Sequence, residues 1–138
     1  MRKRILVDSN VLLDIITHDP HWSEWSTQQL SDGLRHHGRL VINPIVFAEI
    51  SFAFETIEAV NDILSPMDYD YTFIPREAAF LAARCHAQYR IAGGLRTMIL
   101  PDFLIGAHAV VDNMTLLTRD VRRYRTYFPS LQLICPGE

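Results

Sequence analysis

The stretch Arg4-Ile5-Leu6-Val7-Asp8-Ser9-Asn10-Val11 decides the fold, because an apolar run ends abruptly in polar residues and apolar residues then return at helical spacing. Residues 4–7 predict a short buried strand that ends at a carboxylate. The residues that follow predict a helix through Asp14, capped by Ser9 or Asn10. A strand that leads directly into a helix is the unit from which α/β sheets are built.

The same order of strand and helix recurs along the chain. Apolar runs predict further strands at 40–43, 71–74, 115–118 and 131–134, and helical patterns cover 23–37, 45–54, 56–64, 76–91, 102–112 and 121–127. A glycine pair at 93–94 is expected to open a loop that reaches to 101. Alternation of this kind predicts an α/β fold with a mostly parallel five-stranded sheet and helices on both faces. Without a linker or repeat, residues 1–138 are expected to form a single domain.

Composition excludes several classes of protein. Apolar residues make up 49% of the chain, yet no run of them approaches the roughly 20 residues of a membrane-spanning helix. The first apolar run is interrupted by Asp8 and is too short for a signal peptide. Two cysteines, Cys85 and Cys135, imply no disulfide framework. We therefore expect a soluble cytoplasmic protein without membrane association.

Two carboxylates follow predicted strands. Asp8 comes directly after the first strand, and Asp120 lies just after the strand at 115–118. Ligands of parallel α/β sheets bind beyond the carboxyl ends of the strands, so both positions suit a binding site. An acid at a junction of strand and helix is equally suited to capping the helix, which leaves each position with an ordinary structural explanation.

Two further carboxylates stand on apolar helices. Glu49 is the single charged residue between Pro44 and Phe54, and Asp102 is followed by no formal charge until Asp112. A buried lone carboxylate costs several kcal/mol unless it is paired or bound to a metal. Glu49 could instead pair with an arginine or face solvent, and Asp102 could cap its helix.

Considered together, these acids predict a metal site. Two at strand ends and two on the first turns of helices can converge on one edge of a parallel sheet. They cannot all stay ionised there unless a cation offsets their repulsion. Oxygen ligands select Mg²⁺, with Mn²⁺ able to substitute, and such a site can activate water for hydrolysis of a phosphodiester bond. The predicted metal ligands and catalytic residues are Asp8, Glu49, Asp102 and Asp120.

The net charge of −3 conceals a local basic cluster. Setting the four acids aside leaves 12 acidic against 13 basic residues, so the rest of the chain is nearly neutral. Arginines gather at 119, 122, 123 and 125, and a guanidinium presents a planar fork that suits phosphate oxygens. The cluster is either a contact for nucleic-acid phosphates or an ordinary solvated helix face.

Four segments, in order, resemble the motifs of PIN-domain nucleases. They are Leu6 to Asp14, Pro44 to Ile50, Leu100 to Ala109 and Leu116 to Val121, and each contains one of the four acids. The compact length is similar to that of the VapC toxins, which belong to bacterial type II toxin–antitoxin pairs. A single motif would be a weak signal, whereas four in order along nearly the whole chain are specific.

The resemblance implies a fold and an activity. It implies a PIN-like sheet of order 3-2-1-4-5 and an Mg²⁺-dependent endoribonuclease whose substrate is an RNA such as tRNA or rRNA. It also implies a homodimer and neutralisation by a cognate antitoxin protein. Ser9, Asn10 and Thr118 would support the four acids, and the candidates for contact with RNA are Arg119, Arg122 and Arg123.

One alternative remains open, a catalytically inactive PIN-like module that binds RNA or protein. Two other phosphate-handling folds with acidic clusters are excluded by single residues. Phosphorelay receivers need a lysine late in the chain, where this sequence has only Lys3. Phosphatases of the haloacid dehalogenase type need a second aspartate at the position that Asn10 occupies.

Overall fold

The computed structural model of the chain describes residues 3–36, 38–93 and 99–137. Their strands form one sheet in the order β3-β2-β1-β4-β5, and every pairing is parallel. The strands are β1 (Arg4–Val7), β2 (Arg39–Ile42), β3 (Tyr69–Tyr71), β4 (Thr115–Leu117) and β5 (Leu133–Ile134). The predicted α/β class and strand order are confirmed.

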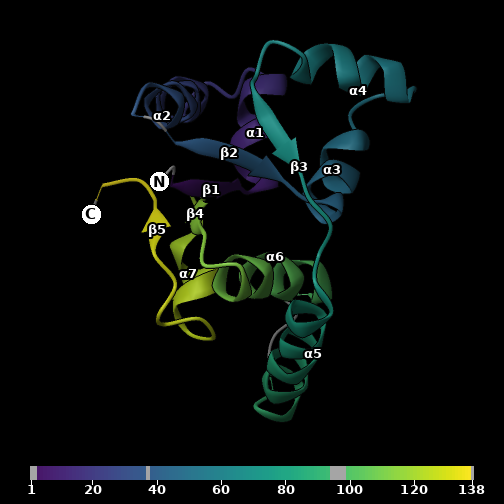
Figure 1. Cartoon of the computed structure of the whole chain (residues 1–138), viewed down its shortest axis with the longest axis vertical. Coiled ribbons are helices and arrows are strands. Elements are labelled where there is room, and N and C mark those ends of the chain that lie inside the picture. Colours follow the sequence, from purple (N-terminus) through teal and green to yellow (C-terminus); the bar gives the residue numbers. More distant parts are fainter. Residues whose placement is uncertain (1–2, 37, 94–98, 138) are drawn as a thin grey trace.

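Seven helices connect the strands within the described residues. They are α1 (Ser9–Ile16), α2 (Ser23–Arg35), α3 (Pro44–Ser51), α4 (Ile57–Leu64), α5 (Arg76–Ile91), α6 (Leu100–Val111) and α7 (Val121–Arg125). Figure 1 shows α1 to α4 around the half of the sheet that contains β2 and β3, with α6 and α7 beside β4 and α5 extending away beyond α6. None of the helices described is long and apolar enough to cross a membrane.

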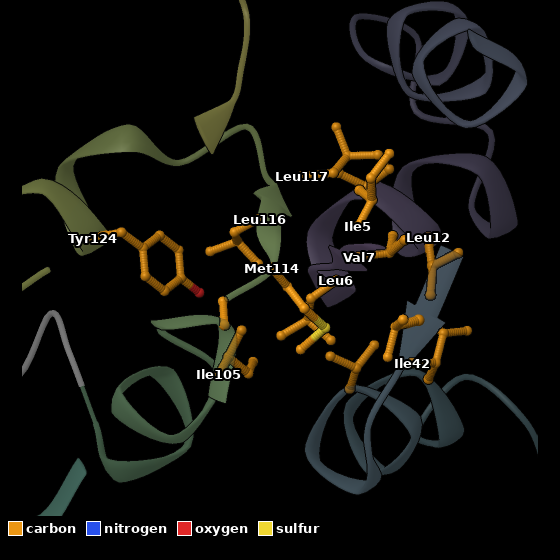
Figure 2. Close-up of a cluster of buried hydrophobic side chains, with 14 of the residues drawn as sticks. Ile5, Leu6, Val7, Leu12, Ile42, Ile105, Met114, Leu116, Leu117 and Tyr124 are labelled. Carbon is orange, nitrogen blue, oxygen red and sulfur yellow. The ribbon is translucent and has the colours of Figure 1, made fainter. Parts of the chain in front are cut away.

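The central strands are buried on both sides of the sheet. Leu6 and Val7 of β1 have no exposed surface, and neither do Leu40 and Val41 of β2. Because adjacent residues of a strand point to opposite faces, their common burial means that both faces are covered. Figure 2 shows side chains from the strands and the flanking helices meeting in this core. Helices on both faces are thereby confirmed.

Some predicted boundaries were wrong. Asp8, rather than Ser9 or Asn10, caps α1, because its backbone is extended and its carboxylate accepts the N–H of Ser9. The third strand lies at 69–71 instead of 71–74, since β2 ends opposite Tyr71 and later residues have no strand to pair with. The last strand is shortened to 133–134 and α2 ends at Arg35. Residue 37 and residues 94–98 of the predicted loop lie outside the described residues.

A buried polar network joins α6 to the start of α3. His108 is fully buried, with Nδ1 3.1 Å from Asn43 Nδ2 and Nε2 3.0 Å from Asp112 Oδ2. Asn43 also caps α3, because its Oδ1 accepts the N–H of Val46. An amide nitrogen can only donate, so Nδ1 accepts and Nε2 carries the proton given to Asp112. The network orients the two helices that carry Glu49 and Asp102.

We predict that Gly106→Ala destabilises the protein, because a Cβ at this position of α6 would overlap the Phe128 ring. Overpacking of this kind should lower the free energy of unfolding by about 1–3 kcal/mol, measured by chemical denaturation. Combining the change with Phe128→Leu should cost less than the sum of the two single changes. Strict additivity of the two effects would contradict the close packing of α6 on Phe128.

Candidate functional site

The four predicted acids come from four different segments. Asp8 follows β1, and Asp120 lies three residues beyond the end of β4, at the start of α7. Asp102 lies in the first turn of α6, as predicted, but Glu49 belongs to the second turn of α3 because that helix begins at Pro44. The helix-capping explanation fails for Asp120, whose side chain makes no capping hydrogen bond.

Asp8 is the most thoroughly bonded of these acids. It is 3% exposed, and its Oδ1 accepts the N–H of Ser9 at 2.8 Å. Oδ2 accepts hydrogen bonds from Tyr124 Oη at 2.8 Å, Thr118 Oγ1 at 2.9 Å and Asn10 Nδ2 at 3.5 Å. Two residues predicted to support the acids, Asn10 and Thr118, therefore contact Asp8 directly.

Like charges are concentrated around Asp8. Burial raises the pKa of the Asp8 carboxyl above its ordinary value, and the negative charge of Asp102 raises it further. The pKa of Glu49 is raised first by its partial burial and then by the charges of Asp8 and Asp102. These three acids therefore lie close enough to repel one another when ionised.

Ser9 connects two of the acids. Its N–H donates to Asp8, and its Oγ donates to Glu49 Oε1 at 2.9 Å. This hydrogen bond favours the ionised form of Glu49 and so opposes the effect of burial on its pKa. Ser9, the third residue predicted to support the acids, thus links Asp8 to Glu49 of α3.

Arg123 links the other two acids. Its Nη1 lies 2.8 Å from Asp102 Oδ1, and its Nε lies 2.8 Å from Asp120 Oδ2. The second carboxylate oxygen of Asp102 accepts the N–H of Ile99 at 3.2 Å, so Asp102 also caps α6. Arg123, one of the three arginines predicted to contact RNA, is therefore paired with acids of the site itself.

The donor set fits a hard divalent cation in its chemistry. In the parts of the chain that the structure describes, no three acidic, histidine or cysteine side chains converge closely enough to form a ready-made metal site. The side chains at this edge are nevertheless carboxylates and hydroxyls, the ligands that Mg²⁺ and Mn²⁺ prefer. A bound cation would reduce the repulsion between these carboxylates. The guanidinium of Arg123 already provides one positive charge there.

Arg119 has a structural role that the sequence did not reveal. Its Nε and Nη2 lie 2.8 and 3.1 Å from the two oxygens of the buried Asp14, and its guanidinium stands 5.5 Å from the Trp22 ring centre. Asp14 also accepts the hydroxyl of Ser26. Because this guanidinium is engaged by an acid and an aromatic ring, we regard it as a counter-ion for Asp14 and consider Arg122 the more accessible candidate for a phosphate contact.

Tyr124 is a site residue that sequence reasoning missed. It is fully buried, and Figure 2 shows its ring reaching from α7 into the core, with the hydroxyl at the inner end. Burial raises the pKa of Tyr124 well above its ordinary value, so the hydroxyl stays protonated and donates to Asp8. A buried tyrosine needs a partner for its hydroxyl, but the sequence could not show that this partner is 116 positions away.

We predict that Asp8→Asn stabilises the protein at pH 7 when EDTA is present. Folding raises the pKa of Asp8, so the folded protein holds the proton of this carboxyl more tightly than the unfolded chain does. The stabilisation that results is fully present below the unfolded pKa of about 3.9. It is lost as the pH rises through the folded pKa. Removing the charge should raise Tm at pH 7 and have a smaller effect below about pH 4. Calorimetry at both pH values measures the difference.

The matched control for this change is Asp14→Asn. Asp14 is as deeply buried as Asp8, but it is paired with Arg119, so its loss should lower Tm. An equal fall of Tm for both variants would contradict the account of Asp8 as a carboxylate destabilised by burial.

We predict that Tyr124→Phe raises the pKa of Asp8 further, because a hydrogen bond that favours the ionised carboxylate is lost. The free energy of unfolding at pH 7 should fall by about 1.5–3 kcal/mol, as expected for a hydrogen bond to a charged group. Carbon-13 NMR of the Asp8 carboxyl measures the pKa. Tyr127→Phe removes a hydroxyl from the same segment and should leave that pKa unchanged, and an unchanged pKa in Tyr124→Phe would disprove the link.

Comparison with known proteins identifies the fold. The sequence model of one family, described as PIN domain, matches residues 5–129. No curated protein matches the sequence.

Solved structures share the fold at low sequence identity. A chain of VapBC2 from Rickettsia felis, bound to a fragment of promoter DNA, has a TM-score of 0.72 at 19% identity, covering 97% of this chain and 99% of that one. A chain of VapBC-1 from nontypeable Haemophilus influenzae has a TM-score of 0.72 at 17% identity, with coverages of 96% and 97%. A chain of DNA-bound VapBC from Salmonella typhimurium reaches 0.65 at 19% identity, covering 98% of both chains. At these identities the similarity extends to the fold alone.

Proposed function

This chain belongs to the PIN-domain family, and from that membership we propose that it is a metal-dependent nuclease. The observation that carries the proposal is the mutual repulsion of three acids that different segments bring to one edge of the sheet. Burial raises the pKa of Asp8 and of Glu49, the charge of Asp102 raises both further, and the charge of Asp8 also raises that of Glu49; carboxylates with raised pKa values gathered in one place are characteristic of a functional site.

The four acids would bind a metal ion, and their neighbours would orient them. Asp8, Glu49, Asp102 and Asp120 are the proposed ligands of Mg²⁺, for which Mn²⁺ could substitute. When bound, such an ion offsets the charge of a phosphate and lowers the pKa of a water molecule. Ser9, Asn10 and Thr118 would orient the ligands, since Thr118 and Asn10 donate to Asp8 and Ser9 donates to both Asp8 and Glu49.

We propose RNA as the substrate, cleaved internally, with tRNA and rRNA as candidates. Arg122 and Arg123 are neighbours in the sequence of α7; Arg122 is exposed, and Arg123 contacts Asp102 and Asp120. An exposed guanidinium next to a metal site can hold a phosphate of the backbone. This arrangement supports a polyanionic substrate without specifying its sequence.

We propose further that the chain is a VapC-like toxin of the cytoplasm, neutralised by a cognate antitoxin. The support is the fold shared with chains of complexes described as VapBC and of one described as a toxin–antitoxin complex from Klebsiella pneumoniae. A homodimer is also proposed. Phe52 and Phe73 are 92% and 77% exposed, and large apolar side chains so open to water favour association with a second chain.

The second candidate function is a PIN-like module that binds RNA or protein without cleaving it. One observation favours this alternative, namely that Arg123 already pairs with both Asp102 and Asp120 and offsets part of their charge. A site whose acids are permanently held by a guanidinium would have less need of a metal ion.

Incubation of the purified protein with total RNA separates the two candidates. We predict cleavage with Mg²⁺ or Mn²⁺ that stops in EDTA, and a loss of about 100-fold or more in Asp8→Asn, Glu49→Gln and Asp102→Asn. Circular dichroism should show that these variants remain folded.

The matched control is Asp62→Asn, which removes an exposed acid of α4 and should leave the rate unchanged. Cleavage that persists undiminished in excess chelator would contradict a metal-dependent nuclease. Binding of RNA without cleavage under any metal condition would favour the inactive module.

A further inference from the structure

The side chain of Arg123 stands between two acids of the proposed metal site. Its guanidinium joins Asp102, on α6, to Asp120, which precedes α7. The side chain of Asp102 is 6% exposed, whereas those of Arg123 and Asp120 are 40% and 36% exposed. One end of the bridge is therefore buried and the other is open to solvent.

Both oxygens of Asp102 already have partners. Oδ1 accepts from Arg123, and Oδ2 accepts the backbone N–H of Ile99 at the start of α6. A divalent ion bound at about 2.1 Å from either oxygen would lie next to the guanidinium, and the two positive charges would repel each other. The ion pair of Asp102 with Arg123 therefore competes with the binding of a metal ion to Asp102.

We propose that Arg123 is the resident cation of the site and that a divalent ion displaces it from Asp102, a proposal that rests on the proposed metal-dependent nuclease. The ion pair offsets one negative charge of the cluster when no metal is bound. Metal binding then has to break that ion pair, which weakens the apparent affinity of the site for metal.

The displaced guanidinium stays near the site. Arg123 follows Asp120 by three residues, so its backbone stays at the start of α7, next to the site, even when a metal ion binds Asp102 and Asp120. Released from Asp102, the planar fork of Arg123 is free to hold a phosphate through two parallel hydrogen bonds. Arg123 therefore has two alternative anionic partners, a carboxylate of the protein and a phosphate of the substrate.

This exchange couples the two ligands. A metal ion favours the displaced position of Arg123, and a phosphate of RNA favours the same position. Each ligand should therefore tighten the binding of the other by the same factor. The coupling depends on Arg123 and not on positive charge in general.

The first test is a titration with Mn²⁺, with the free ion followed by electron paramagnetic resonance and no RNA present. Arg123→Gln should lower the Kd for Mn²⁺ by about fivefold or more, whereas Arg122→Gln, which removes the same charge from the neighbouring position, should change it by less than about twofold. Arg123→Lys keeps the charge but loses the planar fork, so its Kd should lie between those of the wild type and Arg123→Gln. Thermal melts confirm that each variant is folded.

The second test adds a short 2′-O-methyl RNA, which provides phosphates but resists cleavage. It should tighten Mn²⁺ binding to the wild type and leave that of Arg123→Gln nearly unchanged. Equal tightening in both proteins would overturn the role of Arg123 in coupling.

Asp8→Asn distinguishes failure of this proposal from failure of the nuclease proposal. If Asp8→Asn abolishes Mn²⁺ binding while Arg123→Gln binds no tighter than the wild type, the metal site stands and the displacement of Arg123 is wrong. If the wild type and Arg123→Gln bind Mn²⁺ no better than Asp8→Asn, both proposals fail.

Discussion

The parallel pairing of β1 with β4 is the constraint on which the site depends. Val7 pairs with Leu117, and the N–H of Asp8 donates to the carbonyl of Leu117 at 2.9 Å. This register places Thr118 beside Asp8, so that a hydroxyl from one strand end meets a carboxylate from the other. A slip of β4 by one residue would turn Thr118 to the opposite face and remove its hydroxyl from the buried Asp8.

The carboxylate of Asp8, which caps α1, is also unfavourably buried. Asp8 caps α1 and would be favourable there if it were exposed, but in the core its charge remains unfavourable even though Tyr124 and Thr118 donate to it. The chain thus retains an unfavourable charge in a position where a neutral asparagine could also cap the helix. Retention of such a charge is consistent with a ligand that needs it.

The sequence predicts the parts of this protein that depend on neighbours along the chain. Strand order needed the family resemblance, whereas β1 and most helices follow from local apolar spacing. The capping predicted as the structural explanation for Asp102 is present, but its ion pair with Arg123, in the same conformation, was not predicted. The third strand was misplaced because its limits depend on where β2 ends, which is a property of the pairing partner.

Side-chain partners far apart in the chain could not be predicted in the same way. Arg119 and Asp14 are 105 positions apart, and nothing local to either residue distinguishes their ion pair from a phosphate contact. Arg123 shows why this matters, because its pairing with Asp102, 21 positions away, was not apparent from either residue's neighbours in the sequence. If a metal ion displaces this guanidinium as proposed, the position of Arg123 determines whether Asp102 is available to the metal.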